Sequence, residues 1–324
     1  MEKSNIITTM ISVIFLTTLA LQKANAMPDV FIKMERSSDK KTVYLVGDIH
    51  CVEQEACKRF KKPMDDFTSL LEKLSKTKKK TSIITEMSQA RLEQMNSGTN
   101  YPFFIATISK KIKDVIEKEK SKNKDFNMTY CTGDDVRHGS DQLSKLSFNM
   151  LNIAESNIKA GFSSDFQLAI IAGQLTTPQF RAFAILNLAS QNALIDLDTI
   201  KTKSDKDIMK EFHYDYLVRS AKFTKWMNLF AVNNFSLEQQ TTALKTIEEN
   251  KNFIVNFPPN LEAVMNIASS DSSNFVVYYG RYHIEKPKGS TSTVPTIKEM
   301  LEKLGFKETA RSETQIIDIA SIIK

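Results

Sequence analysis

Short apolar segments that alternate with longer amphipathic ones limit the fold of this chain more than any other feature of its sequence. Four of the apolar segments have the length of buried strands, and they cover residues 42–47, 81–86, 127–133 and 274–280. Helical patterns lie between the first three, at residues 63–75, 88–95 and 103–120. Apolar strands that alternate with helices are typical of a mainly parallel sheet covered by helices. We therefore predict an α/β fold with a mainly parallel central sheet flanked by helices.

A long segment with a helical pattern separates the third strand from the fourth. We predict a single domain over residues 27–324, in which residues 140–260 form a large helical insertion before the late strand. The Pro258–Pro259 pair is expected to end this helical region. After the late strand we expect a helix and then one or two closing strands, at residues 295–304 and 305–317.

The first 26 residues have the pattern of a secretory signal. Lys3 is followed by an uncharged stretch that is mostly apolar over residues 6–21, and Ala24-Asn25-Ala26 has the small-x-small form that signal peptidase recognises. We predict a signal peptide at 1–26 and a secreted or periplasmic protein; the alternative is an uncleaved membrane anchor. No later segment is long and apolar enough to span a bilayer.

Composition and charge are those of an ordinary globular protein, with 41% apolar residues, 25% charged residues and a formal net charge of +6. The basic runs at residues 78–80 and 118–124 read as solvated helix ends or loops. They form no basic stripe studded with aromatic residues, so we expect no nucleic-acid partner. The three cysteines, Cys51, Cys57 and Cys131, lack a zinc spacing and cannot all pair within one chain. Two interpretations remain, one disulfide among the three cysteines or buried free thiols.

Polar residues follow each of the four apolar strands. The first strand ends in Gly47-Asp48-Ile49-His50, the second in Glu86, the third in the segment from Gly133 to His138, and the fourth in Gly280-Arg281-Tyr282-His283. The carboxyl ends of parallel strands lie on one edge of the sheet, where open α/β proteins bind their ligands. We expect the polar atoms of His50, Glu86 and His283 to lie within about 10 Å of one another, in one cleft.

Two imidazoles and a carboxylate are the usual ligands of a divalent transition metal that keeps open coordination positions. Asp48 is a further candidate ligand, or a residue that orients a ligand. The same set also suits metal-free acid–base chemistry, and a third interpretation is that these are polar loop ends without chemistry. Arg91, five residues after Glu86, is a candidate partner of that carboxylate or of a substrate.

Two known families share parts of this pattern. Gly47-Asp48-Ile49-His50 and Gly133-Asp134-Asp135-Val136-Arg137 resemble the first two motifs of calcineurin-like metallophosphoesterases, which use a dinuclear metal site. The third motif of that family, Gly-Asn-His-Asp/Glu, has no match, because Gly280-Arg281-Tyr282-His283 lacks the asparagine and no histidine follows it.

The broader resemblance is to the Tiki/TraB/GumN superfamily, whose relatives include erythromycin esterase-like and ChaN-like haem-binding proteins. It covers residues 42–317 and rests on the order of short motifs. These are Gly47 to His50 after the first strand, Glu86 and then Arg91 after the second, Gly280 to His283 after the late strand, and Gly305-Phe306 at the last turn. Asp135 and Arg137 match a recurrent Asp-Arg pair, and Arg219 is a candidate for another recurrent arginine.

This resemblance implies a metal-dependent hydrolase, peptidase-like, that acts on a peptide or a small-molecule substrate. His50, Glu86 and His283 would hold a divalent manganese, cobalt or zinc ion or act as the base. Arg91 and Arg137 would bind the substrate or an oxyanion. The ChaN-like relatives imply a non-enzymatic alternative, an exported protein that binds a ligand such as haem.

Overall fold

The computed structural model describes residues 27–49, 61–96, 104–135, 196–232, 253 and 256–313. The chain divides into two compact units. The first unit contains the described residues up to Gly133, together with Ser269–Gly289 and those from Thr296 onward. The second contains the described residues between Asp134 and Ala268 and the segment Ser290–Pro295.

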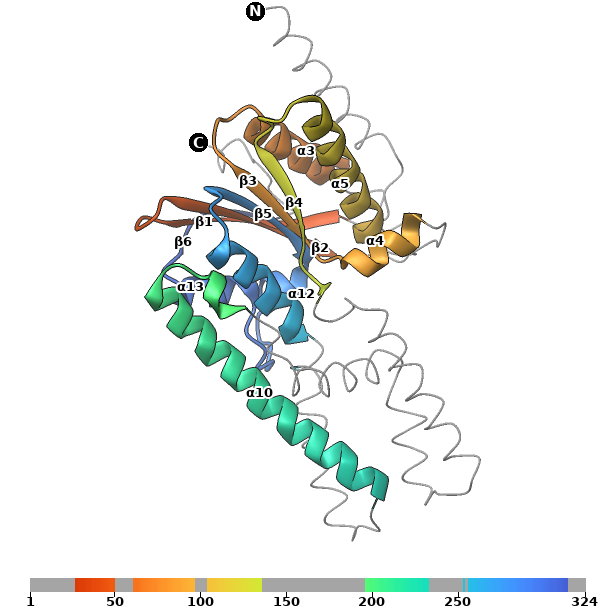
Figure 1. Cartoon of the computed structure of the whole chain (residues 1–324), viewed down its shortest axis with the longest axis vertical. Coiled ribbons are helices and arrows are strands. Elements are labelled where there is room, and N and C mark those ends of the chain that lie inside the picture. Colours follow the sequence, from red (N-terminus) through yellow and green to blue (C-terminus); the bar gives the residue numbers. More distant parts are fainter. Residues whose placement is uncertain are drawn as a thin grey trace, which may run out of the picture. The chain divides into compact units, whose positions relative to one another are not determined.

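A six-stranded sheet organises the first unit (Figure 1). Its strands, in chain order, are β1 (Met27–Arg36), β2 (Lys41–Ile49), β3 (Thr81–Thr85), β4 (Met128–Thr132), β5 (Asn274–Gly280) and β6 (Lys307–Glu313). In space the order is β4-β3-β5-β2-β1-β6. Strands β4, β3, β5 and β2 are mutually parallel, and β1 runs antiparallel to both β2 and β6. The predicted α/β fold with a mainly parallel sheet is therefore confirmed.

The centre of the sheet is buried because its strands are apolar on both faces. Every residue of β5 and every residue of β3 is buried. Successive side chains of a strand point to opposite faces, so Val276 and Tyr278 face one side while Phe275, Val277 and Tyr279 face the other. This double burial explains why the sequence of β5 is an unbroken apolar run and not an alternation of apolar and polar residues.

Helices α3 (Lys61–Ser75) and α5 (Phe104–Lys122) cover the face to which Val276 and Tyr278 belong (Figure 1). Their apolar residues recur at helical spacing and join the strands in one core cluster, which includes Phe67, Leu70, Leu71, Leu74, Ile108, Ile112 and Ile116. Helix α4 (Gln89–Asn96) lies between β3 and α5 in the chain and contacts α5.

Two shorter helices, α12 (Arg281–Ile284) and α13 (Ile297–Lys303), follow β5 and precede β6. A capping box begins α13, in which Thr296 and Glu299 exchange side-chain and backbone hydrogen bonds. Gly305 has a φ of +86° directly after the helix, as a glycine at this position permits. The Arg36 guanidinium then lies 4.6 Å from the centre of the Phe306 ring. These contacts set the turn from α13 into the edge strand β6.

The described part of the second unit is mainly helical. It contains the 3₁₀ helix η3 (Leu197–Thr199), α10 (Lys203–Val232), Phe253 and most of the helical residues 256–269. Aromatic rings form its core, where the Phe253 and Phe257 rings stack with centroids 4.5 Å apart and Tyr216 lies against Phe257. The predicted helical insertion at 140–260 falls mostly outside the described residues and stays a prediction.

The predicted elements of the first unit match those observed to within about two residues, and the expected closing segment contains one described strand, β6. One expectation about the helical region is wrong, because Pro258–Pro259 does not end it. Both prolines are helical, as is Phe253 before them, and the helical residues continue to Ser269. The predicted signal at 1–26 lies outside the described residues. Among the helices that the structure describes, none has the length and apolar character to cross a membrane.

Candidate functional site

The candidate site lies at the carboxyl edge of the sheet, where β2 and β5 end side by side. Asp48 and Gly280 are register partners at these ends. After β2 the chain crosses to α3 on one face of the sheet, whereas after β5 it continues into α12 and α13. The carboxyl ends of parallel strands are the usual ligand position of open α/β sheets.

Glu86 is held at this edge by two hydrogen bonds to β5. Its backbone N–H donates to the Tyr278 carbonyl at 3.1 Å, and its Oε2 accepts from the Gly280 N–H at 2.8 Å. The residue is only 7% exposed. A buried carboxylate needs such donors to offset its lost hydration, and this one is fixed by backbone atoms that do not reorient.

His283 completes a buried pair with Glu86. It lies on α12, three residues past the end of β5, and its Nε2 is 3.3 Å from Glu86 Oε1. The imidazole is 9% exposed, and the Tyr279 ring meets it edge-on with centroids 6.0 Å apart. The two oxygens of Glu86 therefore have separate partners, one the backbone of β5 and the other the imidazole.

Asp48 accepts a hydrogen bond on the other face of the sheet. Its Oδ2 accepts a hydrogen bond from the Tyr278 hydroxyl at 3.0 Å, on the side covered by α3, where Phe67 stacks on the Tyr278 ring. Burial and the neighbouring Asp48 raise the pKa of Tyr278 well above its ordinary value of 10, so the phenol stays a donor. Among the described residues, no three His, Cys, Asp or Glu side chains are grouped so as to hold a metal, and Asp48 thus does not complete a cluster with Glu86 and His283.

Glycines at two strand ends permit close packing of the chain against itself. A Cβ on Gly47 would lie 2.5 Å from Val30 Cγ1 and 3.2 Å from the Arg281 Cα, so α12 can approach the end of β2 only over a glycine. A Cβ on Gly133 would overlap the Tyr279 hydroxyl, which donates to the Gly133 carbonyl. Both glycines thus serve the approach of one backbone segment to another.

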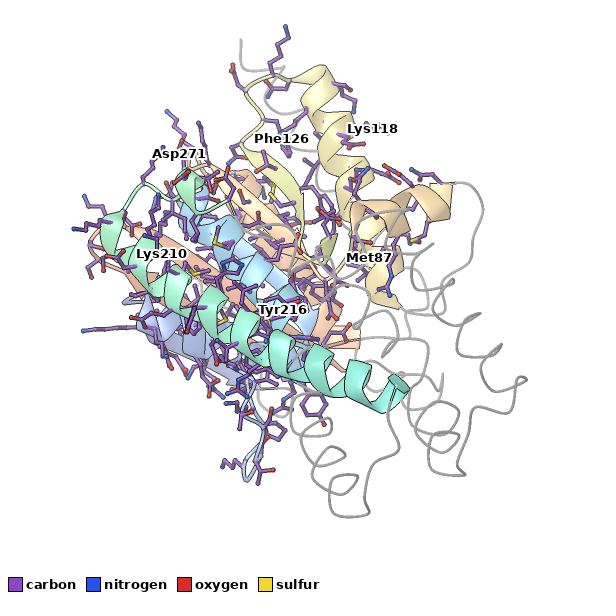
Figure 2. The ribbon with its side chains drawn as sticks, turned by 60° about the horizontal axis from the view of Figure 1, so that its bottom comes forward. Met87, Lys118, Phe126, Lys210, Tyr216 and Asp271 are labelled. Carbon is purple, nitrogen blue, oxygen red and sulfur yellow. The ribbon has the colours of Figure 1, made fainter. Side chains whose placement is uncertain are left out.

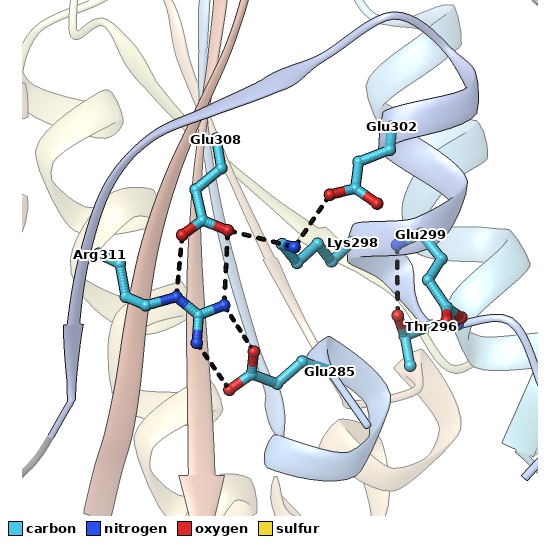
Figure 3. A network of polar contacts seen from close by, with 7 residues as sticks. All are labelled: Glu285, Thr296, Lys298, Glu299, Glu302, Glu308 and Arg311. Carbon is cyan, nitrogen blue, oxygen red and sulfur yellow. Dashed lines mark hydrogen bonds and ion pairs between the residues drawn. The ribbon is translucent and has the colours of Figure 1, made fainter. Parts of the chain in front are cut away.

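An ionic network ties α12 to the neighbouring α13 and β6 (Figure 3). Arg311 donates to Glu285, the residue that caps α12, at 2.7 Å and to Glu308 at 2.9 Å. Lys298 joins Glu308 to Glu302. Burial alone would raise the pKa of Glu308, but the hydrogen bonds from Arg311 and Lys298 lower it overall. Each partly exposed pair contributes little to stability, yet together they restrain the short helix that carries His283.

The structure brings together part of the site expected from the sequence. Glu86 and His283 are in contact, well inside the expected separation, whereas His50 and Arg137 lie outside the described residues. Arg91 is half-buried on α4, with its backbone N–H bonded to Ser88 Oγ at 3.2 Å. Its part in the site stays a prediction.

Arg219 belongs to the second unit and is engaged there. Its guanidinium pairs with Asp215 at 3.1 Å, donates to Thr293 and lies 4.3 Å from the centre of the Phe253 ring. These contacts account for the side chain as a structural element of its own unit.

Two tyrosines of β5 were not among the residues expected at the site. Tyr278 and Tyr279 are consecutive, and each is completely buried with its hydroxyl bonded to a residue at another strand end. A pair of tyrosines in an otherwise apolar strand was the available signal, because buried phenols need hydrogen-bond partners.

The Glu86–His283 geometry suits a divalent metal as well as a direct hydrogen bond. Two ligands bound tetrahedrally at about 2.0–2.1 Å from one ion lie about 3.4 Å apart. The 3.3 Å between Nε2 and Oε1 fits two adjacent ligands of that kind. A third protein ligand would then have to come from outside the described residues, and His50 directly follows the last of them on β2.

Comparison with known proteins adds no relative. No protein-family profile matches the chain, and neither a curated protein nor a solved structure is detectably similar to it.

Proposed function

We propose that this protein is an exported, metal-dependent hydrolase whose reaction centre lies at the carboxyl edge of its sheet. The observation that carries the proposal is the buried contact of Glu86 with His283, beside the end of β2 from which His50 follows. Buried ionisable pairs at the carboxyl ends of strands are concentrated at functional sites. The resemblance to the Tiki/TraB/GumN superfamily supports the same residues.

In this proposal His50, Glu86 and His283 hold a manganese, cobalt or zinc ion. The Gly280 N–H fixes the Glu86 carboxylate, so Oε1 is presented in one orientation without reorganisation. The ion would supply Lewis acidity and lower the pKa of water that it binds. Arg91 and Arg137 are proposed to bind the carboxylate or oxyanion of a peptide or small-molecule substrate.

The same contact permits a metal-free alternative. Glu86 Oε1 can accept a hydrogen bond from His283 Nε2 and thereby orient the imidazole as a general acid or base. In both versions Glu86 and His283 are indispensable, but only the first requires a metal.

The test is metal content by elemental analysis of purified protein after incubation with each of the three ions. We expect stoichiometric binding by the wild type and its loss in His50→Ala, Glu86→Gln and His283→Ala, with unchanged circular dichroism. His213→Ala is the matched control, since it removes an imidazole from the second unit, and it should bind as the wild type does. Metal retained by His283→Ala, or absent from the wild type, would defeat the metal-dependent version and leave the acid–base one.

A further inference from the structure

The amino edge of the sheet carries a concentration of lysines that the candidate site does not use. They lie in two segments, residues 72–80 at the end of α3 and residues 117–125 at the end of α5. Nine lysines against four acidic residues give these segments a net charge of +5, compared with +6 for the whole chain. We call this surface the lysine patch, and its lysines are Lys73, Lys76, Lys78, Lys79, Lys80, Lys118, Lys120, Lys122 and Lys124.

The two segments form one surface because they lead into neighbouring strands. Thr81 and Met128, the first residues of β3 and β4, are register partners. The Asn127 side-chain amide donates to the carbonyls of Leu74, Thr77 and Lys79, which joins the loop before β4 to the loop before β3. Figure 2 shows this end of the unit, with Lys118 and Phe126 labelled on the α5–β4 side.

Most of these lysines are exposed. Lys76, Lys78, Lys79 and Lys80 are all exposed, and no ion pair is recorded for them among the described residues. Lys122 pairs with Glu119 at 3.0 Å. Like charges gathered in this way repel one another, so the patch lowers the stability of the isolated protein and gains most from an anionic partner.

The chemistry of the patch selects a kind of partner. All nine cations are lysines, which act as point charges and lack the planar fork by which arginine recognises single phosphates. The one aromatic residue within its loops, Phe126, packs against the core and is not available to stack on nucleic-acid bases. The patch occupies loop tips and helix ends at one edge of the unit, a shape that suits a flat charged surface.

We propose that the lysine patch docks the protein on a bilayer that contains anionic phospholipids. Clusters of four to eight lysines bind such surfaces electrostatically, and each lysine raises the affinity about fivefold. The patch lies at the amino ends of β3 and β4, and the Glu86–His283 pair lies past the carboxyl ends of β3 and β5. A seven-residue strand spans about 23 Å. Docking would therefore leave the candidate site facing away from the bilayer.

The experiment measures binding of the full chain to vesicles by co-sedimentation. One set of vesicles is phosphatidylcholine alone, and in the other phosphatidylglycerol replaces part of it. Every variant contains the apolar residues 6–21, so the neutral vesicles measure any insertion of that segment. We expect the wild type to bind the anionic vesicles more strongly than the neutral ones, and the difference to vanish at high salt.

The patch variant combines Lys76→Glu, Lys78→Glu and Lys79→Glu and should bind anionic vesicles at least about 100-fold more weakly. A second variant, Lys120→Glu with Lys124→Glu, tests whether the other segment belongs to the same surface and should also bind more weakly. The control variant changes three exposed lysines elsewhere to glutamate, namely Lys203, Lys288 and Lys307. Its affinity for anionic vesicles should fall far less.

Equal losses in the patch and control variants would overturn the proposal, because net charge alone would then explain the binding. Equal binding of the wild type to neutral and anionic vesicles would overturn it as well. Tighter binding to heparin or to single-stranded DNA than to anionic vesicles, at the same salt, would assign the patch to a soluble polyanion instead. None of these outcomes depends on whether Glu86 and His283 bind a metal.

Discussion

Replacement of Tyr278 by phenylalanine removes a single hydroxyl, on the face of the sheet opposite Glu86 and His283. The residue is completely buried, and its hydroxyl donates to Asp48 Oδ2 at 3.0 Å. Phenylalanine keeps the ring and so keeps the stack on Phe67, whose centroid is 5.1 Å away. A hydrogen bond to a charged group contributes about 1.5–3 kcal/mol. We expect the free energy of unfolding of the first unit to fall by about 2 kcal/mol.

Tyr44→Phe is the matched control for this change. Tyr44 belongs to the same core cluster and is 9% exposed, but no hydrogen bond of its hydroxyl is recorded among the described residues. Its replacement should change the free energy of unfolding by less than about 0.5 kcal/mol. Urea unfolding followed by far-ultraviolet circular dichroism gives the free energy of unfolding of both variants. We expect the slope of this free energy against urea concentration to stay constant. Fluorescence of Trp226, the only tryptophan, follows the second unit separately.

The pH dependence gives an independent check on Tyr278. Its pKa in the folded state is raised well above the ordinary value of 10, so its stabilising effect is complete below pH 10 and is lost as the pH rises further. The difference in stability between wild type and Tyr278→Phe should therefore shrink in alkaline solution. If Tyr278→Phe and Tyr44→Phe lower the midpoint of urea unfolding equally, the hydrogen bond to Asp48 does not stabilise the end of β2.

Three further predictions concern other buried groups. Gly133→Ala should destabilise the first unit by about 3 kcal/mol in urea unfolding, because the added methyl overlaps the Tyr279 hydroxyl; a change below about 0.5 kcal/mol would contradict this. Burial lowers the pKa of His213 below 6.5, so its stabilising effect is present above pH 6.5 and is lost as the pH falls. His213→Gln should therefore flatten the acid side of the plot of stability against pH, and an unchanged plot would refute this. Burial raises the pKa of Cys131, so peptide mapping should find it alkylated far more slowly in the native protein than in urea at pH 8, unlike a reactive thiol.

The parallel strands were predictable from the sequence because double burial leaves an unbroken apolar run. Strand β1 was not, although it pairs with β2 over its whole length. It mixes charged and apolar residues, and its position between two antiparallel neighbours depends on segments far along the chain. Most residues of β6 are exposed, and only the preceding turn at Gly305 indicated that a strand follows.

The sequence also placed polar residues at one edge of the sheet but did not assign their contacts. Glu86 and His283 follow their strands at positions that the parallel arrangement brings together. Asp48 does not join this pair because its side chain points to the other face of the sheet. The register of β2 against β5 determines that face. The hydroxyl contacts of Tyr278 and Tyr279 join residues 230 and 146 positions apart, and no local pattern encodes such distances.

The position of β1 has a consequence for the order in which the protein folds. Val30 pairs with Glu313, and β5, which separates β2 from β3, is also made late in synthesis. A nascent chain that ends before residue 274 therefore lacks the strand that joins the two halves of the sheet. Contacts between such distant segments form slowly, because the closure of long loops costs entropy before any contact is gained. The two halves of the sheet can therefore join only after most of the chain has been synthesised.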